Sequence, residues 1–390
     1  MLGKIIVSLA CACASLTAGA APYIPASGAQ VLERLPGGLD PARRELQGLR
    51  TALAANPHNL DLATRLAQRY IEQSRRDGDP RYLGYAQAAL APWWNQPQAP
   101  SSVMVLRATL RQSTHQFAPA LTDLEAVLKR DSGNSQAWLT RATVQLITGD
   151  FAGARSSCMR LYSRAPELVV QACLANVGNV SGQAAASYER LRQTYIARAD
   201  SPPALRAWVA TLLGEMAARL GRPDAAEAHF REALAFDAED SYLLGAWSDF
   251  LLDRGRAPEV ITLLKDKTQA DALLLRYAIA LKNAGRPEAA GATAELAARF
   301  DAAMRRRDSV HQREQARFEL ALRGDAAAAV RLAKLNWAVQ KEPADLRILA
   351  QTAAASKDPE ARAIVQAWLA SSRIEDATIA STVASLGSKA

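Results

Sequence analysis

Histidine and cysteine, whose side chains most often bind metals or act as nucleophiles, are sparse in this chain of 390 residues. The four histidines are His58, His115, His229 and His311, and none has a second histidine or a cysteine at the spacing of a metal-binding motif. The segment Asp77-Gly78-Asp79 lacks the remaining ligands of a calcium loop. We therefore expect no metal site.

Other catalytic motifs are also missing from the sequence. It has neither the G-x-S-x-G turn of a serine hydrolase nor the G-x-x-x-x-G-K-[ST] loop that binds phosphate. The acid pairs Glu239-Asp240 and Glu375-Asp376 are typical of helix starts, where negative charge is favoured by the helix dipole. We expect no cofactor and no enzymatic activity.

The elements that carry these residues repeat along the chain. When Met104–Ser132 is laid over Trp138–Pro166 at an offset of 34, similar residues align at six places. The aligned pairs are Met104 with Trp138, Ala108 with Ala142, Phe117 with Phe151, Ala120 with Ala154, Leu124 with Cys158, and Val127 with Leu161.

A turn residue marks each copy, with spacings of 34, 33, 39, 34, 30 and 39. The turn residues are His115, Gly149, Gly182, Gly221, Gly255, Gly285 and Gly324. A glycine after the last helical residue adopts the left-handed conformation freely, and a proline two residues later, as in Gly221-Arg222-Pro223, suits a new helix start. Each turn therefore joins two helices.

Small residues in these helices would let the paired helices approach closely, and larger ones would fill the remaining space. The small residues are Ala142, Ala154, Gly214, Ala226, Ala278 and Ala290, and the large ones are Trp138, Phe151, Phe230 and Leu274. The best single copy is Trp208–Ala238, where Gly214 is expected at the helix crossing.

This pattern of large, small and aromatic residues at a period of 34 resembles the tetratricopeptide repeat. The resemblance implies an all-α fold, a right-handed superhelical solenoid of antiparallel helix hairpins. Composition agrees with it, since aromatic residues make up only 6% and no strand-rich region is present. No hairpin can bury its apolar face alone, so neighbouring repeats must stack.

The expected organisation has five segments. They are a signal peptide (1–20), an extended lead-in rich in proline and glycine (21–38), degenerate N-terminal hairpins (39–100), the repeat array (101–370) and a C-terminal capping helix or tail (371–390). Ser371-Ser372 is expected to cap the last helix, whose apolar face would hold Ile374, Ile379, Val383 and Leu386. A disordered tail is the alternative.

The first twenty residues have the features of an export signal. Lys4 precedes an apolar run from Ile5 to Leu16, and Ala18-Gly19-Ala20 forms a small-x-small cleavage site. We expect cleavage after Ala20 and a periplasmic protein, or a secreted one, without a transmembrane segment. An acylated Cys11 or Cys13 is the rival hypothesis, although the apolar run before Cys11 is short.

The expected export bears on whether the cysteines form a disulfide. Cys11 and Cys13 would leave with the signal, so the mature chain would keep Cys158 and Cys173. An even count in an oxidising compartment favours a disulfide. The repeat phase places the two residues in adjacent helices of neighbouring hairpins. Two separately buried free thiols are the alternative.

Two further features have both a functional and a structural interpretation. Trp93-Trp94, in a proline-rich stretch, could form a binding surface or could cover the end of a hairpin. The run Arg305-Arg306-Arg307, followed by Arg313 and Arg317, could attract an anionic partner or could be a solvated helix face. We favour the structural interpretation of both. The net charge of +8 does not indicate nucleic acid as the partner of an exported protein.

The resemblance further implies a partner-binding groove lined by the first helix of each hairpin. The residues at groove positions are Leu139, Thr143, Ile147, Trp208, Leu212, Glu215, Arg219, Tyr242, Asp249, Asp253, Arg276, Ile279, Lys282 and Asn283. The carboxylate clamp known in the family is not matched, because the equivalent positions hold Leu275 and Ile279.

We therefore expect a non-catalytic scaffold or adaptor that binds a peptide or helix of another cell-envelope protein. The alternative is an enzyme or ligand carrier for a small molecule or a cell-wall glycan, with a site near Tyr82, Trp93 and Trp94.

Overall fold

The computed structural model describes residue 27, residues 41–306 and residues 310–387. The expected signal peptide, its cysteines and nearly all of the lead-in lie outside these residues. The chain divides into two compact units, Met1–Glu45 and Leu46–Ala390, and apart from the start of the first helix the features below belong to the second.

The described residues form helices and connecting turns, and no strand occurs among them. In chain order the helices are α1 (Pro41–Ala55), α2 (Leu60–Asp77), α3 (Arg81–Ala89), α4 (Ala91–Trp94), α5 (Ser101–Ser113), α6 (Phe117–Arg130), α7 (Ser135–Ile147), α8 (Phe151–Met159), α9 (Glu167–Asn179), α10 (Ala184–Ala197), α11 (Pro203–Arg219) and α12 (Pro223–Phe236). They continue as α13 (Ser241–Asp253), α14 (Ala257–Leu264), α15 (Asp271–Asn283), α16 (Ala289–Arg305), α17 (Gln312–Phe318), the π-helix η1 (Glu319–Arg323), α18 (Ala326–Val339), α19 (Pro343–Ser356), α20 (Pro359–Ser372), the 3₁₀ turn η2 (Ala377–Ile379) and α21 (Ala380–Gly387).

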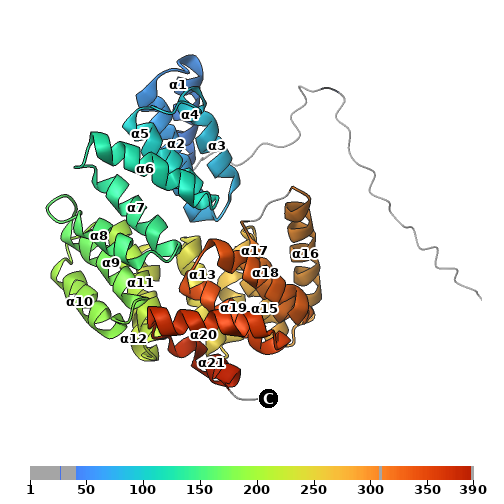
Figure 1. Ribbon diagram of the computed structural model, residues 1–390. Helices are drawn as coiled ribbons and strands as arrows, with labels where there is room; N and C mark the ends of the chain where they lie inside the picture. The colour runs from blue at the N-terminus through green and yellow to red at the C-terminus, as the bar shows by residue number, and fades with distance from the viewer. Residues whose placement is uncertain (1–26, 28–40, 307–309, 388–390) are drawn as a thin grey trace, which may run out of the picture. The chain divides into compact units, whose positions relative to one another are not determined.

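Consecutive helices pack as antiparallel hairpins, and each hairpin contacts the next (Figure 1). The backbone confirms the repeat phase, because all seven turn residues identified from the sequence have positive φ. Their φ values are 57° for His115, 87° for Gly149, 75° for Gly182, 69° for Gly221, 72° for Gly255, 63° for Gly285 and 72° for Gly324.

Gly214 lies at the expected helix crossing between α11 and α12. A methyl group at its Cα would lie 2.9 Å from Cδ1 and Cε1 of Phe230. Glycine therefore lets the two helices approach each other more closely than any larger residue would. Ala142, Ala154, Ala226 and Ala278 are buried as predicted. Ala290 is exposed, and its predicted place in the packing is wrong, because α16 buries Leu296, Phe300 and Ala303 instead.

Cys158 on α8 and Cys173 on α9 form a disulfide, with their Cα atoms 5.7 Å apart. The bridge joins the second helix of one hairpin to the first helix of the next, as the repeat phase predicted. Both residues are buried with Ala142, Leu161 and other apolar side chains in one core cluster.

The C-terminal helices differ from the prediction in one detail. Ser371 and Ser372 lie in the last turn of α20, which ends where Arg373 adopts a φ of 55°. The side chain of Asp376 caps the following segment by accepting from the backbone N–H of Thr378. The expected apolar face is present, since Ile379 and Leu386 are buried with the adjacent core.

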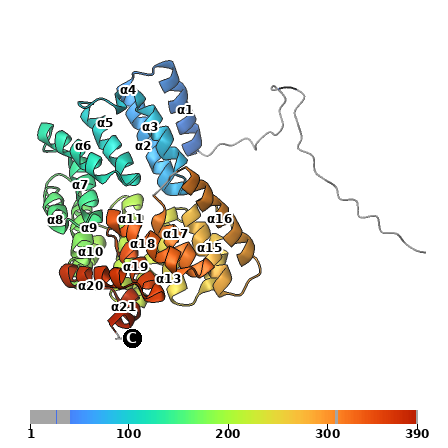
Figure 2. The same cartoon turned by 45° about the vertical axis from the view of Figure 1, so that its right-hand side comes forward.

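The C-terminal segment packs on turns of much earlier repeats (Figure 2). A methyl group placed on Gly149 would lie 2.8 Å from the Trp368 ring, one on Gly182 would lie 3.1 Å from Cβ of Arg373, and one on Gly221 would lie 3.5 Å from Cβ of Ala377. The backbone N–H of Lys341 also donates to the carbonyl of Ile147 at 2.7 Å. Three successive turns therefore meet three successive positions near the C-terminus.

Candidate functional site

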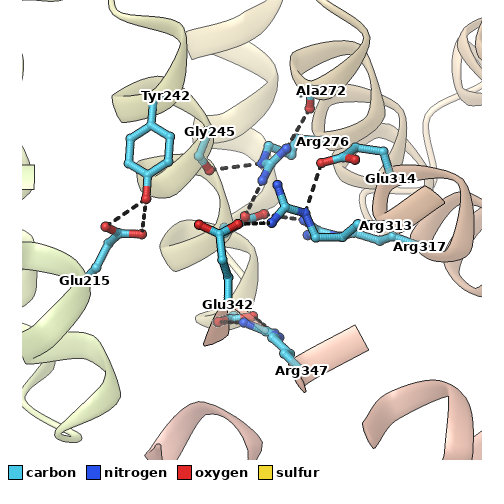
Figure 3. Close-up of polar contacts among 12 residues, drawn as sticks. Glu215, Tyr242, Gly245, Ala272, Arg276, Arg313, Glu314, Arg317, Glu342 and Arg347 are labelled. Atoms are coloured by element: carbon cyan, nitrogen blue, oxygen red, sulfur yellow. Dashed lines mark hydrogen bonds and ion pairs between the residues drawn. The ribbon is translucent and has the colours of Figure 1, made fainter. Parts of the chain in front are cut away.

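Charged side chains gather on the first helices of the later hairpins (Figure 3). We call this group the first-helix cluster. It consists of Glu215 on α11, Tyr242, Asp249 and Asp253 on α13, Arg276 on α15, Arg313, Glu314 and Arg317 on α17, Glu342 directly before α19, and Arg347 on α19.

Asp249 is the most strongly paired member of the cluster. Its carboxylate accepts from Nη2 of Arg276 and from Nη1 of Arg317, both at 2.6 Å. Arg276 also donates to the backbone carbonyls of Gly245 and Ala272. Desolvation acts to raise the pKa of Asp249, but attraction to the two arginines outweighs it and holds the pKa well below its usual range.

A second ion pair joins helices that are further apart in the sequence. Nη1 of Arg347 on α19 donates to Oδ2 of Asp253 on α13 at 2.7 Å. Acidic residues of α13 are therefore paired with basic residues of α17 and α19. Arginines of the chain itself therefore cover part of the α13 surface that carries Asp249 and Asp253.

Arg313 stands among several carboxylates. It donates to Glu314 at 3.1 Å and to Glu342 at 3.0 Å, and it lies 3.4 Å from Asp345. Desolvation acts to lower the pKa of Arg313, but the three carboxylates raise it well above its usual value. Asp345 is fully buried and also accepts from the side chains of Asn336 and Gln340.

Glu215 and Tyr242 form a pair of a different kind. The Tyr242 hydroxyl donates to the Glu215 carboxylate, with distances of 3.0 and 3.1 Å to its two oxygens. Desolvation raises the pKa of Glu215, and attraction to Arg219 offsets only part of the rise. The negative charge of Glu215, followed by desolvation, raises the pKa of Tyr242 well above its usual value.

The predicted groove residues fall into several groups. Trp208 and Tyr242 are 41% and 62% exposed, and Asn283 is exposed at the end of α15. Glu215, Asp249, Asp253 and Arg276 belong to the first-helix cluster, where each is paired with another of its members. The guanidinium of Arg219 donates to Asn179 when the amide oxygen of Asn179 is turned toward it. The ammonium group of Lys282 donates to the carbonyls of Ala321 and Leu322.

The remaining groove predictions are not met as stated. Leu212 and Ile279 are 6% and 7% exposed and belong to the apolar core, so they present no surface to a partner. Leu139 and Ile147 are half-buried at the edges of core clusters, and the hydroxyl of Thr143 donates to the backbone of its own helix.

The contribution of α17 and α19 to this site was not predicted from the sequence. Arg313 and Arg317 are paired with carboxylates, so their interpretation as a solvated helix face is wrong. Asp249 lies six residues before Gly255, but the residue six before Gly324 is the buried Phe318, so counting back from the turns does not identify Arg317.

Trp93 and Trp94 pack against the N-terminal core cluster, which agrees with the structural interpretation of this pair. Trp94 also borders a cavity of about 560 Å³ together with Ile71, Leu83 and Leu110. Among the described residues, no group of three or more His, Cys, Asp and Glu side chains is placed to hold a metal ion. Within the same residues, no helix is both long enough and apolar enough to cross a membrane.

Comparison with known proteins supports the fold. No protein-family model and no curated protein matches the chain. A chain in the crystal structure of the APC/C hetero-tetramer Cut9-Hcn1 is similar to it, with a TM-score of 0.50 and 14% identity, over 84% of this chain and 59% of that one. This chain thus matches less than two thirds of the length of that structure.

Two further structures are similar at lower TM-scores. A tetratricopeptide repeat protein from Parabacteroides merdae has a TM-score of 0.30 and 14% identity, over 73% of this chain and 98% of that one. Yeast Tom70 has a TM-score of 0.32 and 12% identity, over 88% and 91%. The hairpin period, the turn geometry and the likeness to the first structure establish a tetratricopeptide-repeat fold, an all-α solenoid, as predicted.

Proposed function

We propose that this protein is a non-catalytic scaffold of the bacterial cell envelope that binds a segment of another protein on the first helices α11 and α13. Exposed aromatic residues on that face carry the proposal. Trp208 and Tyr242 lie 34 residues apart at equivalent positions of two successive repeats, and both are exposed although the helices around them are largely buried. Exposed tryptophan and tyrosine are typical anchors of protein interfaces.

The polar surroundings of the two aromatic residues agree with this use. Desolvation raises the pKa of both Glu215 and Glu342, and the charge of Glu215 adds to the rise at Glu342. A partner would therefore meet exposed aromatic area beside partly buried carboxyl groups. Such a combination gives both affinity and orientation.

The envelope location rests on the sequence of residues 1–20 and on the Cys158–Cys173 disulfide, which suits an oxidising compartment. Cell fractionation followed by N-terminal sequencing tests it. We expect the protein in the periplasmic fraction with Ala21 as its first residue. A cytoplasmic chain that keeps Met1 would refute the export proposal.

Site-specific photocrosslinking tests the binding surface. A benzoylphenylalanine placed at Trp208 or Tyr242 in intact cells is expected to give a discrete adduct with one partner. Ile196, 60% exposed on the second helix of another hairpin, provides the matched control position. Adducts that are equally strong at Ile196, or none at Trp208 and Tyr242 in a folded protein, would refute the proposed surface.

A ligand carrier remains the second candidate, because one cavity is large enough for a small molecule. The cavity of about 560 Å³ is bordered by Trp94, and by the polar side chains of Gln87 and Gln116 as well as apolar ones. A thermal-shift screen with cell-wall sugars tests this candidate. A rise in Tm with one sugar that disappears in Trp94→Ala would favour the carrier over the scaffold.

A further inference from the structure

Equivalent positions of two successive repeats differ in their partners. Glu215 on α11 and Asp249 on α13 are 34 residues apart, the same offset that relates Trp208 to Tyr242. Asp249 accepts hydrogen bonds from two guanidinium groups of the chain itself, those of Arg276 and Arg317. This position of the repeat is therefore an arginine-binding position in the neighbouring hairpin.

Glu215 has no such partner among the described residues. Its carboxylate hydrogen-bonds to the Tyr242 hydroxyl, and it forms no ion pair within 4.0 Å in the part of the chain that the structure describes. Arg219 lies one turn later on α11, but its guanidinium is directed at the amide oxygen of Asn179. Arg219 and Arg313 therefore attract Glu215 only from a distance, without direct contact.

Few cations are available to the carboxylates near Glu215. Glu215 lies near enough to Glu342 for its charge to raise the pKa of Glu342, and Arg313, which donates to Glu342, is shared with Glu314 and Asp345. A single guanidinium thus faces three carboxylates on this side of the cluster. A further positive group would be attracted there, and burial would strengthen that attraction.

The two exposed aromatic residues supply the rest of a recognition surface for a cation. The ring of Tyr242 is anchored by its hydroxyl to Glu215, and Trp208 lies two helical turns before Glu215 on the same face of α11. The planar guanidinium group of arginine can stack on an aromatic ring while its N–H groups donate to a carboxylate. The same chain uses this chemistry elsewhere, with Arg206 over the ring of Tyr195 at 4.1 Å while it donates to Glu232.

We propose that Glu215, together with Trp208 and Tyr242, is the docking point for an arginine side chain of a partner protein segment. The partner arginine would take the place at Glu215 that Arg317 of the chain itself takes at Asp249. This inference rests on the proposed function and specifies it, because it names the chemistry of the bound segment.

Selection from a random dodecapeptide library displayed on phage, against the full chain, tests the proposal. We expect the selected peptides to share an arginine, and synthetic versions to lose at least about tenfold in affinity in Glu215→Gln. Glu125→Gln, at an exposed position of α6, is the matched control and should leave the affinity unchanged. Replacement of the peptide arginine by citrulline should reproduce the loss.

A second variant guards against a folding defect in Glu215→Gln. Tyr242→Phe keeps the ring and removes the hydroxyl that occupies Glu215, so arginine peptides should bind it no more weakly than the wild type. Peptides that lose binding in Trp208→Ala but are unaffected by Glu215→Gln and by citrulline would overturn the arginine site and leave the scaffold proposal standing. If no selected peptide depends on Trp208 or Tyr242, both proposals fail.

Discussion

Glu215 and Asp249 occupy equivalent positions of successive repeats, yet the pKa of the first carboxyl is raised and that of the second is lowered. Desolvation acts on both in the same direction. The difference comes from Arg276 and Arg317, which bind Asp249 directly, whereas Glu215 has a neutral tyrosine hydroxyl as its hydrogen-bond partner. Replacement of each carboxylate by the corresponding amide should therefore change the stability of the protein in opposite directions.

Asp249→Asn should destabilise the protein at neutral pH by about 1–3 kcal/mol, because two arginines lose their shared charged partner. The lowered pKa of Asp249 means that its contribution is present above the unfolded pKa, near 4, and is lost as the pH falls through the folded value. Urea unfolding at pH 7 and in acid measures the difference. An equal loss at both pH values would contradict this explanation.

Glu215→Gln should instead raise the stability at pH 7. A raised carboxyl pKa means that the native state favours the protonated form, so the contribution of Glu215 is complete below the unfolded pKa and is lost as the pH rises through the folded one. Glutamine stays neutral and can still accept from Tyr242. Thermal unfolding should show a higher Tm for the variant at pH 7 and nearly equal values near pH 4. A lower Tm at pH 7 would show that the charge is stabilised.

Gly149→Ala should destabilise the protein more than Gly255→Ala. Both glycines have positive φ, 87° and 72°, so both variants carry a backbone penalty of about 1 kcal/mol. Only at Gly149 would the new methyl group meet the Trp368 ring, at 2.8 Å, while nothing lies within 4 Å at Gly255. The added overpacking is expected to cost about 1–3 kcal/mol. Equal free energies of unfolding for the two variants would mean that the Trp368 ring can move away from the methyl group at little cost.

Reduction of the Cys158–Cys173 bridge should lower the free energy of unfolding by about 3 kcal/mol, since the cysteines are 15 residues apart. Urea curves with and without reductant measure the loss. The double variant Cys158→Ala/Cys173→Ala serves as the control and should not respond to reductant. Alkylation of Cys158 and Cys173 in the unreduced, unfolded protein would contradict the bridge.

Gly214→Ala should destabilise the protein although alanine is the better helix former. Its methyl group would lie 2.9 Å from the Phe230 ring, which is itself almost fully buried and cannot move away freely. Gly245→Ala provides the comparison, because its nearest neighbour would be the Arg276 guanidinium at 3.5 Å. We expect Gly245→Ala to be neutral or slightly stabilising. A stable Gly214→Ala protein would show that α11 and α12 can separate without loss.

The features that depend on local sequence were predictable. Glycine at Gly149 or Gly221 determines where a helix can end, and the small residue at Gly214 determines where two helices cross. The hairpins and the placement of Cys158 and Cys173 on adjacent helices therefore followed from the repeat phase. The predicted cap at Ser371-Ser372 was wrong, because α20 continues through Ser372 and ends at Arg373. Arg373 adopts the left-handed conformation although it is not a glycine, so the sequence did not mark this helix end.

The composition of the first-helix cluster could not be derived in the same way. The pairing of Asp249 with Arg317 depends on how sharply successive hairpins turn, which no single repeat encodes. The π-helix at Glu319–Arg323 adds to the difficulty, because its extra residue shifts the phase between α17 and the following turn. The burial of Leu212 and Ile279 likewise depends on neighbouring hairpins.

The contacts of Trp368, Arg373 and Ala377 with early turns have a consequence for folding. In an open repeat array each hairpin depends only on its neighbours, and unfolding can spread from either end. Here residues as distant in sequence as Gly149 and Trp368 must meet before the native packing is complete. Such contacts raise the contact order, slow folding and couple the C-terminal hairpins to those that contain Gly149, Gly182 and Gly221, so that these repeats gain or lose structure together.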